Sequence, residues 1–400
     1  MLTRSIQLFV VIASSILTLV ATDILLPSLP QIAQSFAVPS SEAKLIISIF
    51  MLGQFATVLV WGIIADLIGR RQTLLTGMLI FLIASILSLY AHSINFLLAC
   101  RFLQGTGAVV VPVAGWALIQ DLYPKDEGAR IMSWIGTLVA MLPLFAPAIG
   151  GKIDVLYGWQ MNLYGIALYS TILCILMLIL LKRSANNSNS AAHELKETLL
   201  IYSKILKNKT FISYIALFGL LNCGEWCFLT VAPFYYDHIH ISPDKMGILL
   251  MLTSMGFLFG SMLASRLFSR LGVDKTFSLG IHIALASSAL LLVGNYLGWC
   301  DYQIFNAIDI SMYIFSSALL WGGSTSRALQ CFDEFRGSAS AVRSLILLCF
   351  SAFGTYSGRV LNHESLLPTG IVLLILALCA LFVFHSKELK AERLSTEVVY

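Results

Sequence analysis

Charged residues are scarce in this sequence. Only 12% of its 400 residues are Asp, Glu, Lys or Arg, whereas 58% are hydrophobic, and soluble domains carry about 25% charged residues. A chain of this composition cannot be folded around one aqueous core, so lipid is the expected solvent. The net charge of +4 is small and gives no reason to expect a nucleic acid as a partner.

The sequence also lacks the groupings that enzymes and metal sites need. Its eight cysteines indicate no disulfide framework, and most lie in apolar runs, where a thiol behaves as a small hydrophobe. Cys223 and Cys227 share a helix face, but no histidine or further cysteine flanks them to complete a metal site. No cluster of histidine, acid and nucleophile is evident, and only a short tail follows His385. We therefore expect no enzyme, no sensor, no metal site and no cofactor.

Long apolar runs are what the sequence has in abundance. About 20 helical residues cross a hydrocarbon core of roughly 30 Å, whereas barrel strands would show about ten residues of alternating polarity. The first run has no convincing cleavage site, so we expect it to be retained and not removed as a signal peptide. The twelve predicted transmembrane helices are 5–26, 44–65, 73–91, 95–119, 130–150, 161–181, 210–233, 246–266, 276–294, 304–327, 337–357 and 366–385.

Lysine and arginine are unevenly distributed among the segments between these helices. With the N-terminus in the cytoplasm, 18 of the 25 basic residues fall in cytoplasmic segments and four in outer segments, one of which is Lys44. The remaining three lie within spans and are Arg101, Arg327 and Arg343. Because positive segments stay on the cytoplasmic side, both ends of the chain are predicted to be cytoplasmic.

A polar stretch that includes Asn186 to Ser190 separates six apolar runs from six others. Such a stretch is typical of a soluble linker between two membrane halves. The sequence thus predicts an all-α membrane protein with an N-terminal six-helix half over 1–181, a cytoplasmic linker over 182–209, a C-terminal six-helix half over 210–385 and a cytoplasmic tail over 386–400.

The loop between the second and third runs reads Gly62-Ile-Ile-Ala-Asp-Leu-Ile-Gly-Arg-Arg71. It resembles the G-x-x-x-D-x-x-G-R-R/K loop of the major facilitator superfamily, a resemblance that implies two pseudo-symmetric halves and a transport function. The implied cytoplasmic gate motif consists of Gly62, Asp66, Gly69, Arg70 and Arg71. Asp66 is expected to meet the positive end of a helix from the other half, or an arginine such as Arg130. The stretch from Ala264 to Gly272 is a degenerate copy that lacks the acid.

Two further motifs resemble those of drug:proton antiporters. In the fourth run, Arg101-Phe-Leu-Gln-Gly-Thr-Gly-Ala108 is similar to R-x-x-Q-G-x-G-A. In the fifth run, Ala146-Pro-Ala-Ile-Gly-Gly151 is similar to G-P-x-x-G-G, with alanine in place of the first glycine. The resemblance implies an antiporter hinge at Pro147, Gly150 and Gly151, where a missing hydrogen bond and small residues permit bending and close packing.

Other segments point to one branch of the superfamily. Asp23-Ile-Leu-Leu-Pro-Ser-Leu-Pro30, the stretch from Ala232 to Gly247 and Gly337-Ser-Ala-Ser-Ala341 resemble the bicyclomycin/chloramphenicol-resistance (Bcr/CflA) branch. Two positions depart from the pattern. Ser15 stands where some related antiporters carry another membrane acid, and Gln160 replaces the arginine of the family's Gly-Trp-Arg.

Proton coupling requires a carboxyl group that changes its protonation state within the membrane. The resemblance implies Asp23 as this group, because the matching acid of related antiporters binds protons and substrate, and Glu225 is the second candidate. A cap or headgroup-layer role for Asp23 stays open, since Pro27 and Pro30 follow it closely. Asp309 is interpreted as a helix-end residue at the interface.

The substrate cavity is predicted to include Arg101, Gln104, Trp226, Trp321 and Arg343. A buried arginine is expensive in a membrane and should face a cavity, although a structural tie to backbone carbonyls remains an alternative for Arg101. Arg343 and Arg101 together would suit an anionic solute. Equally open is an interhelical pair that joins Arg343 or Arg327 to one of the acids.

These observations predict a proton-coupled antiporter that exports a small organic molecule, such as a drug-like compound or a metabolite, by alternating access. An importer of a nutrient, metabolite or siderophore on the same fold is the alternative. The expected partners are the substrate, protons and the lipid bilayer of the cytoplasmic (inner) membrane. We expect the protein to work as a monomer. The substrate itself is not identified by the sequence.

Overall fold

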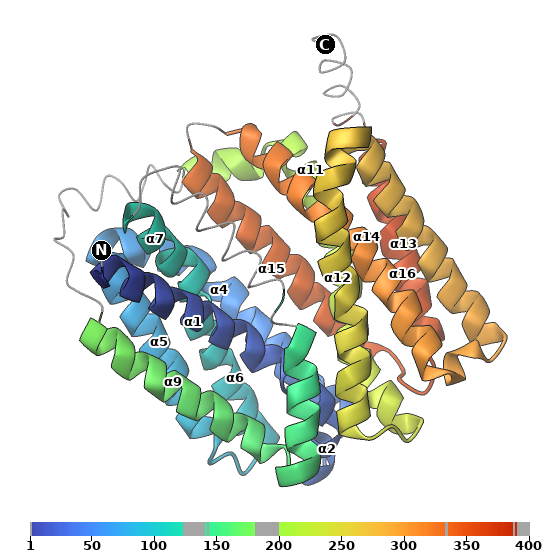
Figure 1. Cartoon of the computed structure of the whole chain (residues 1–400), viewed down its shortest axis with the longest axis horizontal. Coiled ribbons are helices and arrows are strands. Elements are labelled where there is room, and N and C mark those ends of the chain that lie inside the picture. The colour runs from blue at the N-terminus through green and yellow to red at the C-terminus, as the bar shows by residue number, and fades with distance from the viewer. Residues whose placement is uncertain are drawn as a thin grey trace, which may run out of the picture. The chain divides into compact units, whose positions relative to one another are not determined.

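The computed structural model describes residues 2–122, 141, 144–180, 200–332, 335–386 and 389. Every regular element within these ranges is a helix (Figure 1). The helices are α1 (Leu2–Asp23), η1 (Leu26–Ser28), α2 (Leu29–Ser35), α3 (Ser40–Ala43), α4 (Leu45–Ile68), α5 (Arg70–Ser88), α6 (Ile94–Ala108), η2 (Val111–Gly115), α7 (Trp116–Leu122), α9 (Gln160–Leu180), α11 (Lys209–His238), α12 (Pro243–Leu271), α13 (Val273–Tyr296), η3 (Trp299–Asp301), α14 (Gln303–Gln330), α15 (Arg336–Val360) and α16 (Leu367–Phe384). Residues 144–157 and 200–206 are helical as well.

Eleven helices in the described part of the chain are long and apolar enough to cross a membrane. They correspond to the predicted spans other than the fifth, over 130–150, most of which lies outside the described residues. The prediction of an all-α membrane protein is confirmed. Of the predicted linker over 182–209, the structure describes the last part, where residues 200–206 form a helix.

Prolines follow the end of the first predicted span and interrupt the fourth. The first span ends as α1 at Asp23, and η1 and α2 each begin with a proline in the first turn, Pro27 and Pro30. Proline suits a helix start because the first N–H groups have no intrahelical partner anyway. In the fourth span Pro112 lies in η2, one π-helical turn between α6 and α7. A missing N–H breaks the regular ladder there.

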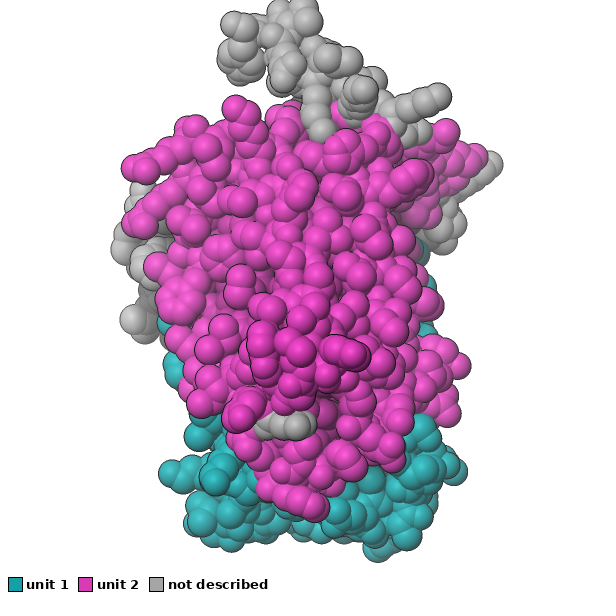
Figure 2. Space-filling model, turned by 90° about the vertical axis from the view of Figure 1, so that its right-hand side faces the viewer, with its two compact units in different colours: residues 1–196, 242–248 teal, residues 197–241, 249–400 magenta. Residues whose placement is uncertain are grey.

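The helices form two compact units (Figure 2). Unit 1 comprises residues 1–196 and 242–248, and unit 2 comprises 197–241 and 249–400. In unit 1, α4 and α5 pack against α6, and α9 packs against α1 and α5. In unit 2, α11 packs against α14, α15 and α16, while α13 packs against α14 and α16. The first turns of α12 belong to unit 1 and the rest to unit 2.

Close backbone approach holds α4 against α6 in unit 1. A Cβ atom at Gly105 would overlap the carbonyl of Phe50, and one at Gly53 would overlap the carbonyl of Phe102. Helices in lipid associate through such small residues, because the solvent around them is as apolar as their own side chains. Gly53 and Gly105 therefore set the spacing of the two helices.

The loops that end α4 and α12 share one local geometry. Gly69 has φ 88° and Gly272 has φ 82°, values that L side chains rarely adopt. One turn later the Thr73 hydroxyl donates to the Gly69 carbonyl at 3.0 Å, and the Thr276 hydroxyl donates to the Gly272 carbonyl at 2.8 Å. The degenerate second copy of the loop motif therefore keeps the turn although its acid is missing.

Replacing Gly105 with alanine tests the close approach of α4 and α6. Gly105→Ala should destabilise the protein by about 1–3 kcal/mol, the range for overpacking a tight interface, and lower the unfolding temperature measured in detergent. Gly165→Ala is the matched control, because a Cβ there meets nothing within 4 Å and alanine is the better helix former by about 1 kcal/mol. Equal unfolding temperatures for the two variants would contradict the account.

Candidate functional site

Arg101 lies in the interior of unit 1, with 0% of its side chain exposed. Its Nη1 atom donates to the Ala21 carbonyl at 3.2 Å and to Oε1 of Gln104 at 2.8 Å. Its Nε atom donates to the Ile46 carbonyl at 3.4 Å, and the guanidinium lies 4.5 Å from the centre of the Phe50 ring. Arg101 thus connects the end of α1 and the start of α4 to α6.

Gln104 extends this network to a fourth helix. It follows Arg101 by three residues, a spacing that places two side chains on one face of a helix. Its Nε2 atom donates to the Ser85 hydroxyl of α5 at 2.9 Å. The carbonyl contacts of Arg101 are those of a structural tie, yet its buried Nη2 atom has no hydrogen-bond partner among the described residues. The guanidinium therefore has one unused donor group.

Asp23 and Lys44 are both buried, and each lies two residues along the chain from a carbonyl that Arg101 binds. Asp23 ends α1, two residues after Ala21, and is 6% exposed; Lys44 precedes Ile46 by two residues and is 1% exposed. Asp23 is thus buried within unit 1. Lys44, which the charge pattern places in an outer segment, is a buried cation that sequence reasoning missed. Its position at the edge of a long apolar run gave no signal of this burial.

The predicted hinge residues lie where three backbone segments of unit 1 meet. A Cβ at Gly150 would overlap the Ile24 carbonyl just after α1, and one at Gly151 would overlap the carbonyl of Pro243, the first residue of α12. Pro147 is buried in the same helix, over 144–157, and its own carbonyl lies against Gly247. Small residues are therefore required here for close packing.

Glu225 lies midway along α11 in unit 2, partly buried. Its carboxyl group lies beside the side chains of Asn222 and Ser317, and the Ser351 hydroxyl donates to Oδ1 of Asn222 at 2.8 Å. The buried Oε2 atom of Glu225 has no hydrogen-bond partner in the described part of the chain. These contacts join α11, α14 and α15, and sequence reasoning missed all three partners because they are polar residues within apolar runs.

The other predicted cavity residues of unit 2 are partly exposed. Arg343 of α15 donates from Nε to the Thr325 hydroxyl of α14 at 3.1 Å. This hydrogen bond joins two helices without an acid. Trp321 packs against Phe257 with ring centres 5.7 Å apart, and Trp226 is partly buried on α11.

The structure places Asp309 deeper in its helix than the interpretation as a helix-end residue expects. It lies six residues into α14, which begins at Gln303, and only 1% of it is exposed. Asn306, Ala307 and Ile310 around it are buried as well, so the second turn of α14 is covered although its first residues are not. Asp309 is therefore a buried acid of unit 2.

The structure describes the gate motif except for the side chain of Asp66. Gly62 lies in α4, Gly69 ends that helix with positive φ, and Nη1 of Arg70 donates to the Ala117 carbonyl of α7. Arg71 is partly buried at the start of α5. The side chain of Asp66 and the whole of Arg130 lie outside the described residues, so the expected contact between them stays a prediction.

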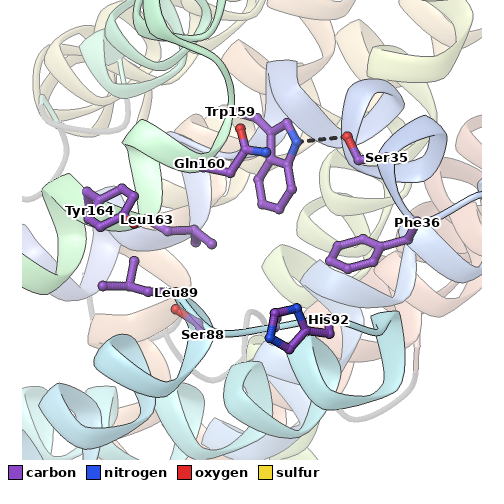
Figure 3. A pocket seen from close by; sticks show the side chains of 10 residues that line it. Ser35, Phe36, Ser88, Leu89, His92, Trp159, Gln160, Leu163 and Tyr164 are labelled. Atoms are coloured by element: carbon purple, nitrogen blue, oxygen red, sulfur yellow. Dashed lines mark hydrogen bonds between the residues drawn. The ribbon is translucent and has the colours of Figure 1, made fainter.

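A pocket opens in unit 1 among the ends of α2 and α5 and the start of α9 (Figure 3). Trp159 donates from Nε1 to the Ser35 hydroxyl at 2.9 Å and tilts against Phe36, with ring centres 5.8 Å apart. Gln160 and His92 also line it. Because Gln160 stands where the resemblance expects arginine, this pocket lacks that cation.

Comparisons with known proteins agree with this fold. The Major Facilitator Superfamily model matches residues 11–354. The chain is 26% identical to multidrug resistance protein MdtL of Shewanella sp. over 90% of this chain and 89% of the relative. It is 23% identical to chloramphenicol resistance protein CraA of Acinetobacter baumannii over 82% and 79%. The fold resembles the crystal structure of a D-xylose–proton symporter, with TM-score 0.72, 14% identity and coverage of 94% and 96%.

Truncating Gln104 tests the polar network around Arg101. Gln104→Ala leaves Nη1 of Arg101 and the Ser85 hydroxyl each short of one buried partner, which should destabilise the protein by about 1–3 kcal/mol. Gln72→Ala on α5 removes the same atoms from an exposed position and serves as the control. The account predicts a lower unfolding temperature for Gln104→Ala alone, and a fall of the same size in both would refute it.

Proposed function

The chain belongs to the major facilitator superfamily, and on that premise we propose that it exports a small organic molecule in exchange for protons. Membership makes it a multi-pass membrane transporter of a small molecule and not an enzyme. Export is supported by relatives whose names describe drug resistance. The likeness to the D-xylose–proton symporter concerns the fold alone and does not favour import.

The observation that carries this proposal is the buried Arg101 network beside Asp23. A charged side chain within a membrane helix is disfavoured by about 2.5–3.5 kcal/mol on insertion scales, so such residues usually serve transport. Nη2 of Arg101 has no partner in the described part of the chain, and an acid and a second cation, Asp23 and Lys44, are buried two residues along the chain from the carbonyls that it binds. A structural tie alone does not require this concentration of charge.

In the proposed cycle the acids carry the protons. Asp23 takes a proton from outside, loses its charge, and so weakens its attraction to nearby cations. Solute that is bound at Arg101 and Gln104 leaves in that state, and Asp23 releases the proton after the protein opens to the cytoplasm. Glu225 is the second proton carrier.

Other parts of the chain have supporting roles in this proposal. Arg343, Trp226 and Trp321 add one cation and two flat apolar surfaces to the substrate-binding residues. The motif from Gly62 to Arg71 acts as a cytoplasmic gate, and Pro147, Gly150 and Gly151 act as the hinge. In this proposal the protein works as a monomer in the inner membrane, with both termini in the cytoplasm.

Cells that lack the protein distinguish export from import. An exporter mutant should retain its solute and become more sensitive to it, whereas an importer mutant should be starved of it. We expect retention when intact and deletion cells are exposed to a panel of drug-like compounds that includes chloramphenicol. A growth defect that only an added nutrient corrects would overturn the proposed direction of transport.

Proteoliposomes test proton coupling through Asp23. With the solute that deletion cells retain, an imposed proton gradient should drive accumulation, and Asp23→Asn should reduce it about 100-fold, the lower range for a positioned proton carrier. Exchange of labelled for unlabelled solute should continue. Asp154→Asn, which removes another buried carboxyl from unit 1, should leave accumulation unchanged.

Two results count against this proposal. Solute flux that does not depend on the imposed proton gradient would refute antiport. Unchanged accumulation in Asp23→Asn moves the coupling role to Glu225.

A further inference from the structure

Three polar side chains stand one helical turn apart along α14. Asp309, Tyr313 and Ser317 are spaced by four residues, which places them on one face of the helix. All three are buried, each with no more than 1% exposed. They therefore form a continuous polar row in the interior of unit 2.

The row leads from Asp309 to Glu225. The Tyr313 hydroxyl lies against α11, because a Cβ at Gly224 would overlap it. Tyr313 is close enough to Glu225 for their charges to interact, and Ser317 lies beside the Glu225 carboxyl. Long side chains lean toward the start of their helix, so the Tyr313 ring lies on the Asp309 side of its own Cα. Tyr313 thus stands between the two acids.

Several polar atoms along this row lack partners among the described residues. They are both carboxyl oxygens of Asp309, the Tyr313 hydroxyl and Oε2 of Glu225. The neighbouring Ser287 hydroxyl donates at 2.8 Å to the backbone carbonyl of Asp309 and also lies beside its carboxyl group. A buried carboxylate without a partner is disfavoured and takes up a proton instead.

The helices around these acids carry mainly thiols and hydroxyls, and the cation Arg343 of α15 binds Thr325, 16 residues along α14 from Asp309. On α11 the titratable groups that face Tyr313 are Cys223, Cys227 and Glu225, and Cys349 of α15 faces Cys223. α12 carries no charged residue between Lys245 and Arg266. The nearest titratable residue of α13 is His282, which is exposed and bonded to Ser278; α16 has only Cys379, also exposed. A proton is therefore the simplest positive partner for Asp309.

We propose that Asp309 is a second proton-binding site and that the Tyr313 hydroxyl passes protons between Asp309 and Glu225. In one transfer the Asp309 carboxyl gives its proton to the Tyr313 oxygen while the Tyr313 hydroxyl gives its own proton to the Glu225 carboxylate. Asp309 becomes a carboxylate, Glu225 becomes an acid, and Tyr313 is unchanged. In the topology predicted from charge, α14 begins on the outer side, so Asp309 receives the proton first. This role for Glu225 rests on the proposed function.

Infrared difference spectroscopy tests the site without a transported solute. The lipid-reconstituted protein is titrated with acid, and the C=O band of protonated buried carboxyl groups is followed. We expect Asp309→Asn to remove one titrating band. Tyr313→Phe should keep that band and shift its frequency, because the carboxyl loses the hydroxyl that lies next to it in the polar row and receives its proton in the proposed transfer. Tyr236→Phe is the matched control, since it also removes a buried tyrosine hydroxyl that has no partner in the described residues.

The proposal is overturned if Asp309→Asn leaves every titrating band in place, or if Tyr236→Phe shifts the band as much as Tyr313→Phe does. Should Asp309→Asn fail to fold, Asp309→Glu keeps a carboxyl and must change the band's frequency; an unchanged frequency overturns the proposal equally. Proteoliposome transport separates this idea from the proposed function. If the unmodified protein shows the Asp309 band but its transport is not coupled to protons, antiport is refuted and the second site is not. If transport is coupled to protons but no band depends on Asp309, the second site is refuted and antiport is not.

Discussion

Arg101 is held by the carbonyls of Ala21 and Ile46 and by Gln104, and the arrangement of four helices in unit 1 depends on this contact. A guanidinium in a hydrocarbon solvent must find its acceptors within the protein, because no water is available there. The acceptors come from the end of α1 and the start of α4, so both ends are fixed relative to α6. Asp23 and Lys44 adjoin those same carbonyls in the sequence and are buried with them. The need of Arg101 for buried acceptors thus also fixes the end of α1, where the proposed proton carrier Asp23 lies.

The buried acids of unit 2 have different neighbours. Glu225 has amide and hydroxyl neighbours, and both carboxyl oxygens of Asp309 lack a partner in the part of the chain that the structure describes. An acid surrounded by neutral groups is biased toward its protonated form, whereas a nearby cation favours the ionised form. The proposed proton carriers therefore lie in different settings: Asp23 is buried in the unit that also buries Arg101 and Lys44, and Glu225 and Asp309 lie among neutral groups in unit 2.

The fold was largely predictable from the sequence, because run length and hydrophobicity decide where a chain crosses a membrane. Pro27 and Pro30 follow the end of the first predicted span, and Pro112 marks the interruption of the fourth, although that predicted span ran through it. The site was predictable only where a residue is unusual for a membrane helix, as with Arg101, Asp23 and Glu225. Ser317, Asn222 and Tyr313 gave no such signal, since a lone polar residue in an apolar run points equally well to lipid, to a neighbouring helix or to a site. Lys44 and Asp309 were misjudged because distance from the end of an apolar run does not report tertiary burial.

The central claim is that solute and protons move in opposite directions through one protein. Proteoliposomes that enclose a pH-sensitive dye measure this directly, when the solute that deletion cells retain is added outside in the absence of an imposed gradient. Solute that enters the lumen should expel protons, so the account predicts a rise in lumenal pH that depends on the protein. A lumenal pH that stays constant or falls while solute enters would contradict it.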